Sequence, residues 1–237
     1  GIGHTRWATH GKPSHANAHP YTDCHGKISL VHNGIIENYR ELRDGLEARG
    51  HRFTSETDTE TVVHLVEENY KGDLRTAVSE SLKQLRGSLA LAVIHRSEPD
   101  KIVVARDERP LVIGLGQDEN FVASDLPALL KHTRRVMYLQ NRELAVITRK
   151  SVHIENFSGE PVTREVSTVD WTPEDTDKGG YQHFMLKEIY EQPRAILESL
   201  IGRIPNLELD IGGIEKEDFD SIKIVACGTS LHAGLVG

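Results

Sequence analysis

Apolar residues alternate with polar ones in parts of this chain and recur every three or four positions in others. Alternation predicts a strand at residues 27–32, which runs into Asn33 and Gly34. Helical spacing of the apolar residues predicts helices at 37–49, 57–70, 74–86 and 126–131. Later apolar runs predict strands at 88–95, 101–106, 111–115, 120–123, 136–139, 142–148 and 151–155. Because helices are grouped between one early strand and a series of later ones, the order indicates an antiparallel α+β domain at residues 1–166.

The pattern changes after this domain. Residues 167–182 are polar and acidic without clear periodicity, which predicts a linker. Helices are predicted at 183–192 and 193–203, with Pro193 in the first turn of the second helix. An apolar run at 221–226 predicts a buried strand, and the Cys-Gly-Thr-Ser turn after it could bind phosphate through backbone N–H groups and hydroxyls.

Composition narrows the class of protein. Hydrophobic residues make up 38% of the 237 residues and charged residues 27%, as in ordinary globular proteins. The net charge of −8 argues against nucleic acid as a main partner. No apolar run approaches the ~18 residues of a membrane span, and no signal-peptide pattern is visible. The two cysteines lie far apart in sequence, which gives no disulfide framework and favours a reducing cytoplasm.

Three short polar clusters border the predicted elements, where substrate sites are commonly built. A guanidinium binds a carboxylate with a planar fork of donors, and a carboxylate pairs with an ammonium. A side-chain amide beside an unhindered backbone N–H provides the two donors of an oxyanion hole. Such a set suits glutamine or asparagine while its side-chain amide is cleaved. The candidate residues are Arg6, Thr9 and His10 in the first cluster, Asn33 and Gly34 in the second, and Asp58 in the third.

Two of these clusters also have purely structural interpretations. Asn-Gly is the strongest hairpin dipeptide, although the residues after Gly34 lead to a helical pattern instead of a returning strand. Thr57 and Glu60 fit a capping box, and the helix dipole favours an acidic residue such as Asp58 in the first turn.

Six histidines crowd the first 32 residues, which suggests a metal site. Only His15 and His19 have the i,i+4 spacing of a helical ligand pair, and Pro13 and Pro20 argue against a helix there. We therefore expect no metal site and no cofactor, with a metal-binding protein as an alternative.

The motifs GHTRWATHG at 3–11, HNGIIEN at 32–38 and SETDTE at 55–60 resemble the glutaminase domain of the glucosamine-6-phosphate synthase family. Two later stretches, at 183–193 and 227–230, resemble the start of the family's sugar-isomerase (SIS) half. The resemblance implies a four-layer αββα domain of the N-terminal-nucleophile (Ntn) hydrolase type at 1–166. It further implies the beginning of an α/β SIS domain at 183–237.

The resemblance also assigns roles in the first polar cluster. Arg6 would bind the α-carboxylate of glutamine, with support from Thr9 and His10. Trp7 would help to gate the passage of ammonia, whereas without the family it would be interpreted as a core anchor.

Further roles follow from the other motifs. Asn33 and Gly34 would form the oxyanion hole, and Asp58 would bind the α-ammonium of glutamine. The sugar phosphate would be bound by Cys227, Gly228, Thr229 and Ser230.

The activity that this implies is the conversion of fructose 6-phosphate and glutamine to glucosamine 6-phosphate and glutamate. A homo-oligomer is implied for the full-length protein. The alternatives are another type-2 amidotransferase, such as the phosphoribosylamine-forming or asparagine-forming type, and a catalytically silent glutamine-binding module.

The cysteines depart from the family pattern. The family's nucleophile is a mature N-terminal cysteine, whereas position 1 here is Gly, so we expect a fragment without glutaminase activity of its own. Cys24 stands beside His25, but neighbours in sequence rarely face each other productively, and a free thiol is the expectation. Ammonia release above background that is abolished by Asn33→Ala would contradict the expected inactivity.

Overall fold

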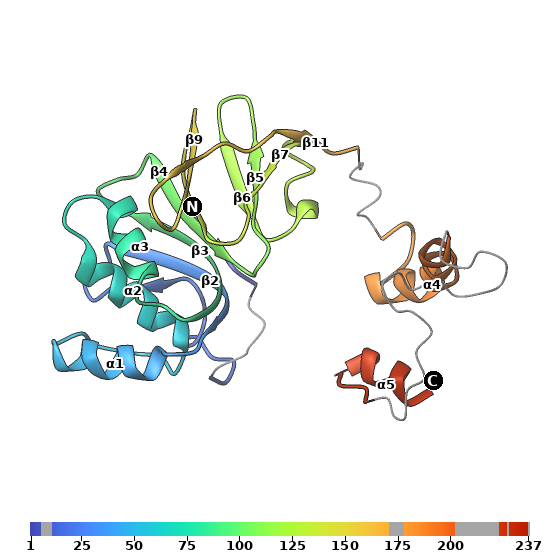
Figure 1. Cartoon of the computed structure of the whole chain (residues 1–237), viewed down its shortest axis with the longest axis horizontal. Coiled ribbons are helices and arrows are strands. Elements are labelled where there is room, and N and C mark those ends of the chain that lie inside the picture. The colour runs from blue at the N-terminus through green and yellow to red at the C-terminus, as the bar shows by residue number, and fades with distance from the viewer. Residues whose placement is uncertain (6–10, 171–177, 202–222, 227, 237) are drawn as a thin grey trace. The chain divides into compact units, whose positions relative to one another are not determined.

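The computed structural model describes residues 1–5, 11–170, 178–201, 223–226 and 228–236. The chain divides into two compact units, residues 1–177 and 178–237, which are described separately (Figure 1). The division lies inside the stretch 167–182 that was predicted to be a linker.

Two antiparallel sheets and three helices make up the described part of unit 1. One sheet has seven strands in the order β1-β2-β3-β4-β8-β9-β10, and the other has four in the order β11-β7-β5-β6. Each neighbouring pair of these strands is antiparallel, which confirms the predicted α+β class. The elements are β1 (Tyr21–Thr22), β2 (Ile28–Ile36), α1 (Tyr39–Ala48), α2 (Asp58–Asn69), α3 (Leu74–Leu82), β3 (Gly87–His95), β4 (Lys101–Asp107), β5 (Val112–Leu115), β6 (Asn120–Ala123), η1 (Leu126–Ala128), β7 (Arg135–Tyr138), β8 (Glu143–Thr148), β9 (Val152–Asn156), β10 (Pro161–Val162) and β11 (Ser167–Thr168).

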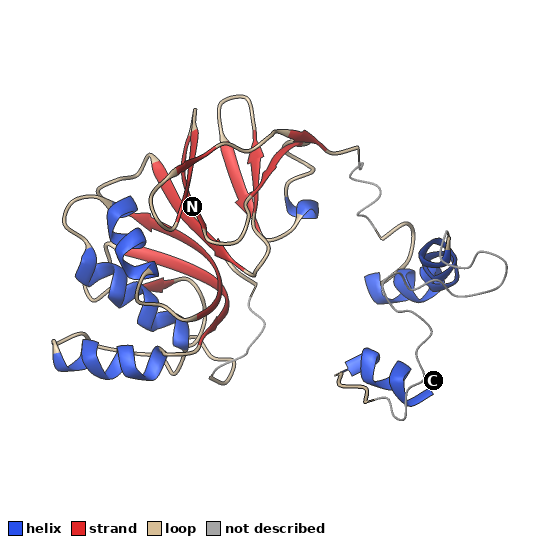
Figure 2. Cartoon of the chain, viewed as in Figure 1, coloured by secondary structure: helices blue, strands red, loops and turns tan. Residues whose placement is uncertain are grey.

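The alternation of side chains along the strands produces two cores. On one face of the seven-stranded sheet, Leu30 and Leu91 pack with Val62 and Val63 of α2, so α2 and α3 cover this face (Figure 2). On the opposite face, alternate residues such as Val104 pack with Ile113 of the four-stranded sheet. The order of layers is therefore helix, sheet, sheet.

A fourth layer is represented only by a short segment in the described part of unit 1. Leu129, which follows the single 3₁₀ turn η1, packs with Val112 and Val136 on the outer face of the four-stranded sheet. Two full helical layers are therefore not seen among these residues.

Several predicted boundaries in unit 1 are corrected. Strand β2 continues through Asn33 and Gly34 to Ile36, because its backbone pairs with β3 as far as Gly87. Helix α3 ends at Leu82, four residues before the predicted end. The first two residues of the predicted linker form β11, which pairs with β7.

Unit 2 contains α4 (Phe184–Leu200) and α5 (Gly228–Val236) among its described residues. The predicted break at Pro193 is wrong, since α4 runs through it. A proline removes one backbone hydrogen bond, and on an exposed helix water can solvate the carbonyl that is left, here that of Ile189. None of the described helices combines the length with the apolar run that a membrane span requires.

The strand predicted at 221–226 does not form over its described residues, 223–226. Ile224 is 56% exposed and Val225 is 96% exposed. A strand needs a neighbour to satisfy its backbone groups, and the described part of unit 2 contains no other strand. The predicted turn at 228–230 is the first turn of α5.

Candidate functional site

A cavity of about 600 Å³ lies where the middle of β2 meets the N-terminal end of α2. Residues 32–35 of β2 and residues 57–59 at the start of α2 form part of its wall. The loops after β4 and β6 add residues 109–110 and 124–125, and His4 and His19 complete the lining. The second and third predicted clusters, Asn33–Gly34 and Asp58, therefore face one cavity.

The backbone at Gly34 requires glycine. Its φ is +130°, and a Cβ at this position would lie 2.0 Å from the backbone carbonyl oxygen of Ser88 on β3. Asn33 and Gly34 pair with Ala90 and Leu89 inside the sheet, so the hairpin interpretation is wrong. The physical reason is that β3, which supplies the pairing strand, lies about fifty residues later in the chain instead of directly after the Asn-Gly pair.

The side chain of Asn33 is oriented by His4. The distance from His4 Nε2 to Asn33 Oδ1 is 2.7 Å. When Nε2 carries the imidazole proton, it donates to Oδ1 and leaves the amide N–H groups of Asn33 as donors. This orientation is the one that an oxyanion hole needs.

Asp58 is 3% exposed and is the first residue of α2. The backbone N–H of Ile36 donates to Asp58 Oδ2 at 2.8 Å, which ties the start of α2 to the end of β2. The positive end of the helix dipole adds favourable interaction with the carboxylate. Asp58 thus provides a fixed negative charge in the wall of the cavity.

The predicted capping box at the start of α2 is wrong. Thr57 occupies the N-cap position, but its side chain makes no capping hydrogen bond. Instead, the carboxylate of Glu60 accepts hydrogen bonds from the backbone N–H groups of Thr54 and Ser55, each at 2.7 Å. Burial alone would raise the pKa of Glu60, but the nearby His64 imidazole, the Ser55 hydroxyl and these backbone bonds lower it to about 2.

His32 lies beside Asp58 and is 4% exposed. Burial lowers the pKa of its imidazole to about 4, although the Asp58 carboxylate acts in the opposite direction. Its Nδ1 lies 2.9 Å from the hydroxyl of Thr59. His32 is therefore neutral at pH 7 and leaves the negative charge of Asp58 available to a cationic group.

Sequence reasoning missed several residues of the cavity, among them His4, His32 and Arg109. The guanidinium of Arg109 donates to the hydroxyl of Ser88 at 3.1 Å and borders the cavity. Arg109 and Asp125 each lie just after a predicted strand, which is the signal that could have drawn attention to them.

The other predicted residues are divided between two parts of the chain. Gly228, Thr229 and Ser230 form the N-terminal turn of α5 in unit 2. Arg6, Trp7, Thr9, His10 and Cys227 lie outside the described residues.

The early histidines take different places. The rings of His4 and His19 stack with their centroids 4.3 Å apart at the cavity. Cys24 does not pair with its sequence neighbour His25, since its Sγ lies 3.6 Å from His64 Nδ1. His25 instead approaches Glu67, at 3.7 Å.

Comparison with known proteins is consistent with this site. Residues 4–131, more than half of the chain, match the family model described as a glutamine amidotransferase domain. Two relatives carry the name glutamine–fructose-6-phosphate aminotransferase [isomerizing]. The one from Thermus thermophilus is 52% identical over 240 residues, and the one from Aquifex aeolicus is 51% identical over 237. In each case the match covers the whole of this chain and 40% of the relative's length.

A solved structure supports the same family. It is the glutamine phosphoribosylpyrophosphate amidotransferase of B. subtilis complexed with ADP and GMP, which superposes with a TM-score of 0.56 and 28% identity. The superposition covers 67% of this chain and 35% of that one. With the family model, these matches show that the chain belongs to the glutamine amidotransferase domain family.

Proposed function

We propose that this chain is the glutaminase part of a glutamine–fructose-6-phosphate aminotransferase. That enzyme would make glucosamine 6-phosphate and glutamate from fructose 6-phosphate and glutamine. The observation that carries the proposal is the cavity in which Asn33, Gly34 and Asp58 come together from two separate elements. The shared name of the close relatives supports the choice of the sugar acceptor.

Asp58 binds the α-ammonium group of glutamine in this proposal. A carboxylate that is fixed by a backbone N–H loses little conformational freedom when it pairs with a cation. The neutral state of His32 supports this role, because a positively charged imidazole beside Asp58 would repel the ammonium.

Asn33 and Gly34 stabilise the oxyanion that forms when a thiolate attacks the side-chain amide. The amide of Asn33 and the backbone N–H of Gly34 are the donors. Loss of one such donor lowers the rate on the order of 10²–10³ in other acyl-transfer enzymes. The strict need for glycine at position 34 supports a backbone held rigidly at this point.

The family resemblance supplies the remaining glutamine contacts. Arg6 would bind the α-carboxylate, Thr9 and His10 would support it, and Trp7 would gate the passage of ammonia. His4, which belongs to the same motif as Arg6, lines the cavity, which supports these assignments.

Unit 2 is proposed to begin the SIS half. The N-terminal turn of a helix presents backbone N–H groups that suit a phosphate, and Gly228, Thr229 and Ser230 form this turn in α5. Cys227 is included on the resemblance alone. A full fourth helical layer in the glutaminase half is proposed on the same basis.

Assembly and location are also proposed from the family. The full-length protein would be a cytoplasmic homo-oligomer. Exposed apolar side chains on α4, such as Met185, Ile189 and Ile196, support further contacts for this unit in the longer protein.

Titration calorimetry with the purified chain tests the glutamine site. L-glutamine should bind at one site per chain, and D-glutamine and L-asparagine should bind at least about 10-fold more weakly, because each misplaces one of the three recognised groups. Equal binding of the two enantiomers, or no binding of L-glutamine, would contradict the proposal.

The identity of the ammonia acceptor is tested with a protein that contains this chain and has the full length of its relatives. Glucosamine 6-phosphate should form from fructose 6-phosphate and glutamine. Transfer to phosphoribosyl pyrophosphate instead would favour the runner-up, which has the same fold. Glutamine binding without any turnover would favour a silent binding module.

A further inference from the structure

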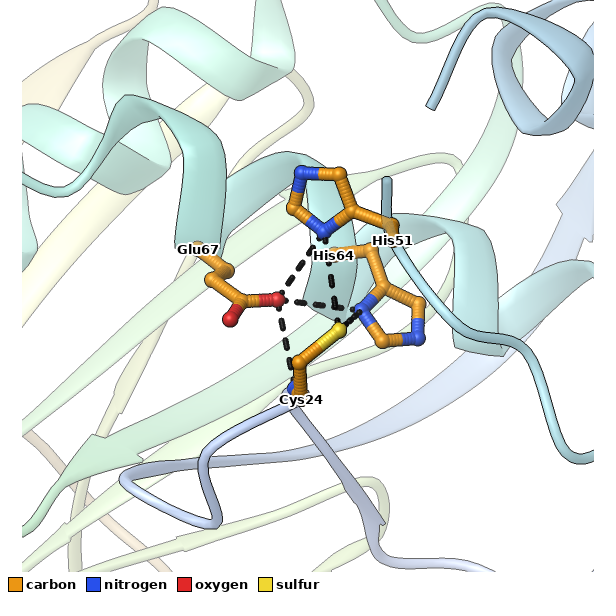
Figure 3. Close-up of side chains that lie close together, drawn as sticks. All are labelled: Cys24, His51, His64 and Glu67. Atoms are coloured by element: carbon orange, nitrogen blue, oxygen red, sulfur yellow. Dashed lines mark hydrogen bonds and ion pairs between the residues drawn. The ribbon is translucent and has the colours of Figure 1, made fainter. Parts of the chain in front are cut away.

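A cysteine, two histidines and a glutamate converge on one side of α2 (Figure 3). Cys24 lies in the turn between β1 and β2, and His51 lies in the loop after α1. His64 and Glu67 lie three residues apart on α2 and so share a helix face. One donor atom from each of the four lies within 4.8 Å of the other three.

The distances between the donors resemble those around a tetrahedral metal ion. Cys24 Sγ lies 3.6 Å from His64 Nδ1 and 3.9 Å from His51 Nδ1. Glu67 Oε2 lies 3.0 Å from His51 Nδ1 and 3.1 Å from His64 Nδ1. Zinc bonds of about 2.0–2.3 Å at tetrahedral angles separate neighbouring donors by roughly 3.3–3.6 Å. These four separations lie within a few tenths of an ångström of that range, and the other two pairs of donors are at most 4.8 Å apart.

Hydrogen bonding explains only part of this cluster. Glu67 Oε2 can accept from both imidazoles and from the backbone N–H of Cys24, which accounts for the carboxylate. Each Nδ1 that donates its one proton to Glu67 has no second proton for the sulfur of Cys24, which faces the same two nitrogens. A cation between the four donors gives the sulfur, both imidazoles and the carboxylate one common partner.

We propose that unit 1 binds one Zn²⁺ through Cys24 Sγ, His51 Nδ1, His64 Nδ1 and Glu67 Oε2. Thiolate and imidazole ligands suit zinc and disfavour Mg²⁺ and Ca²⁺, which prefer oxygen. Four ligands from the protein close the coordination sphere, as in structural zinc sites. This inference departs from the expectation of no metal site, which rested on the early histidines alone.

Supporting groups surround the proposed ligands. The backbone N–H of Arg52 points at Cys24 Sγ, 3.4 Å away, as in N–H···S bonds to a thiolate. Glu60 Oε1 lies 3.8 Å from His64 Nε2, on the ring edge away from the proposed ion. Such partners orient metal-bound residues. His64 is 1% exposed whereas Cys24 is exposed, so the ion would enter from the Cys24 side.

The site would have a structural role. Zn²⁺ would join the β1–β2 turn and the loop after α1 to helix α2, three segments that are separate in sequence. Because these ligands are brought together only in the folded chain, binding would stabilise it.

Cobalt is the probe that reports the ligands directly. The purified chain is treated with chelator, desalted and titrated with Co²⁺ under reducing conditions. One equivalent should bind, with a sulfur-to-cobalt charge-transfer band and the visible absorption of tetrahedral cobalt. One equivalent of Zn²⁺ should displace it and should raise the melting temperature of the chain.

Variants separate this site from adventitious binding. Cys24→Ser should remove the charge-transfer band, and His51→Gln should weaken binding by more than the 10- to 100-fold typical of a lost supporting group. Both positions are near the surface, and circular dichroism checks that the variants fold. His15→Gln is the matched control and should bind as the parent chain does.

The proposal is wrong if the parent chain takes up less than one equivalent, or if binding survives in both Cys24→Ser and His51→Gln. These measurements involve no glutamine, so they are independent of the glutaminase proposal.

Discussion

At the scale of single residues, Gly34 shows how the pairing of β2 and β3 restricts the candidate oxyanion hole. Its φ of +130° suits glycine alone, and the Ser88 carbonyl occupies the space of a side chain. The Asn-Gly pair that was singled out in the sequence therefore has an unusual backbone, which lies in a strand instead of a turn.

Gly34→Ala should lower the free energy of unfolding by about 3 kcal/mol or more, because the new Cβ would push β2 away from β3. Urea unfolding measures this loss. Gly45→Ala, in the middle of α1, is the matched control and should be neutral or stabilising by up to about 1 kcal/mol, since alanine favours a helix. Similar losses in the two variants would show that β2 tolerates a side chain.

His32 gives a second prediction, on the dependence of stability on pH. Its pKa is about 4 in the folded chain and about 6.5 when unfolded, so the unfolded state binds more protons between these values. The contribution of the neutral His32 to stability is fully present above pH 6.5 and is lost as the pH falls from 6.5 toward 4. The free energy of unfolding should therefore decrease by about 2 kcal/mol from pH 7 to 4.5.

His32→Gln should flatten this decrease, while His153→Gln, at an exposed position of β9, should leave it unchanged. Groups that face His32 are Asp58, His4 and Arg109. Denaturant titrations at several pH values provide the comparison. A slope that is the same with and without His32 would mean that its imidazole is not held neutral.

At the scale of elements, the start of α2 depends on Glu60 more than on its N-cap residue. The carboxylate of Glu60 accepts hydrogen bonds from the backbone N–H groups of Thr54 and Ser55, which lie just before the helix. The sequence placed Glu60 in a capping box with Thr57, because the spacing is right. Spacing does not reveal that the backbone N–H groups of the residues before Thr57 donate to this carboxylate instead.

Glu60→Gln should lower the free energy of unfolding by about 2–3 kcal/mol, because an amide N–H₂ would face a backbone N–H that has lost its acceptor. The measurement is made in the presence of chelator so that it does not depend on bound metal. Glu80→Gln on α3 removes an exposed pair with Lys83 and should cost less than about 1 kcal/mol. Equal effects would contradict the role of Glu60.

Strands β2, β3, β4 and β8 were predictable because their side chains alternate between two cores, which is a local pattern. The two-residue strands β1, β10 and β11 were not predicted. Two errors came from elements whose outcome depends on surroundings. Pro193 does not end α4, since an exposed helix can lose one hydrogen bond and continue. Residues 223–226 are apolar enough for a strand, but the described part of unit 2 gives them no strand to pair with.

At the scale of the whole molecule, part of the site could be predicted because it is built from compact motifs. Asn33, Gly34 and Asp58 were identified from the sequence and share one cavity. Arg109 and His4 could not be placed there without the fold, since the sequence gives no distance between segments. The same limit applies to Cys24, which the fold brings to His51 and His64 and not to its neighbour in sequence.

The most direct test of the glutamine site is a binding cycle at Asp58. The purified chain and its Asp58→Asn variant are titrated with L-glutamine and with glutaramate, which is glutamine without the α-ammonium group. Asparagine keeps the shape of aspartate and can still accept the N–H of Ile36. Circular dichroism confirms that both chains fold.

Asp58→Asn should weaken the binding of L-glutamine about 10- to 100-fold, because one buried charge-assisted contact is lost. The binding of glutaramate should be unchanged or slightly tighter. An equal effect on both ligands would mean that Asp58 does not bind the ammonium, and the account of the cavity as a glutamine site would then be contradicted.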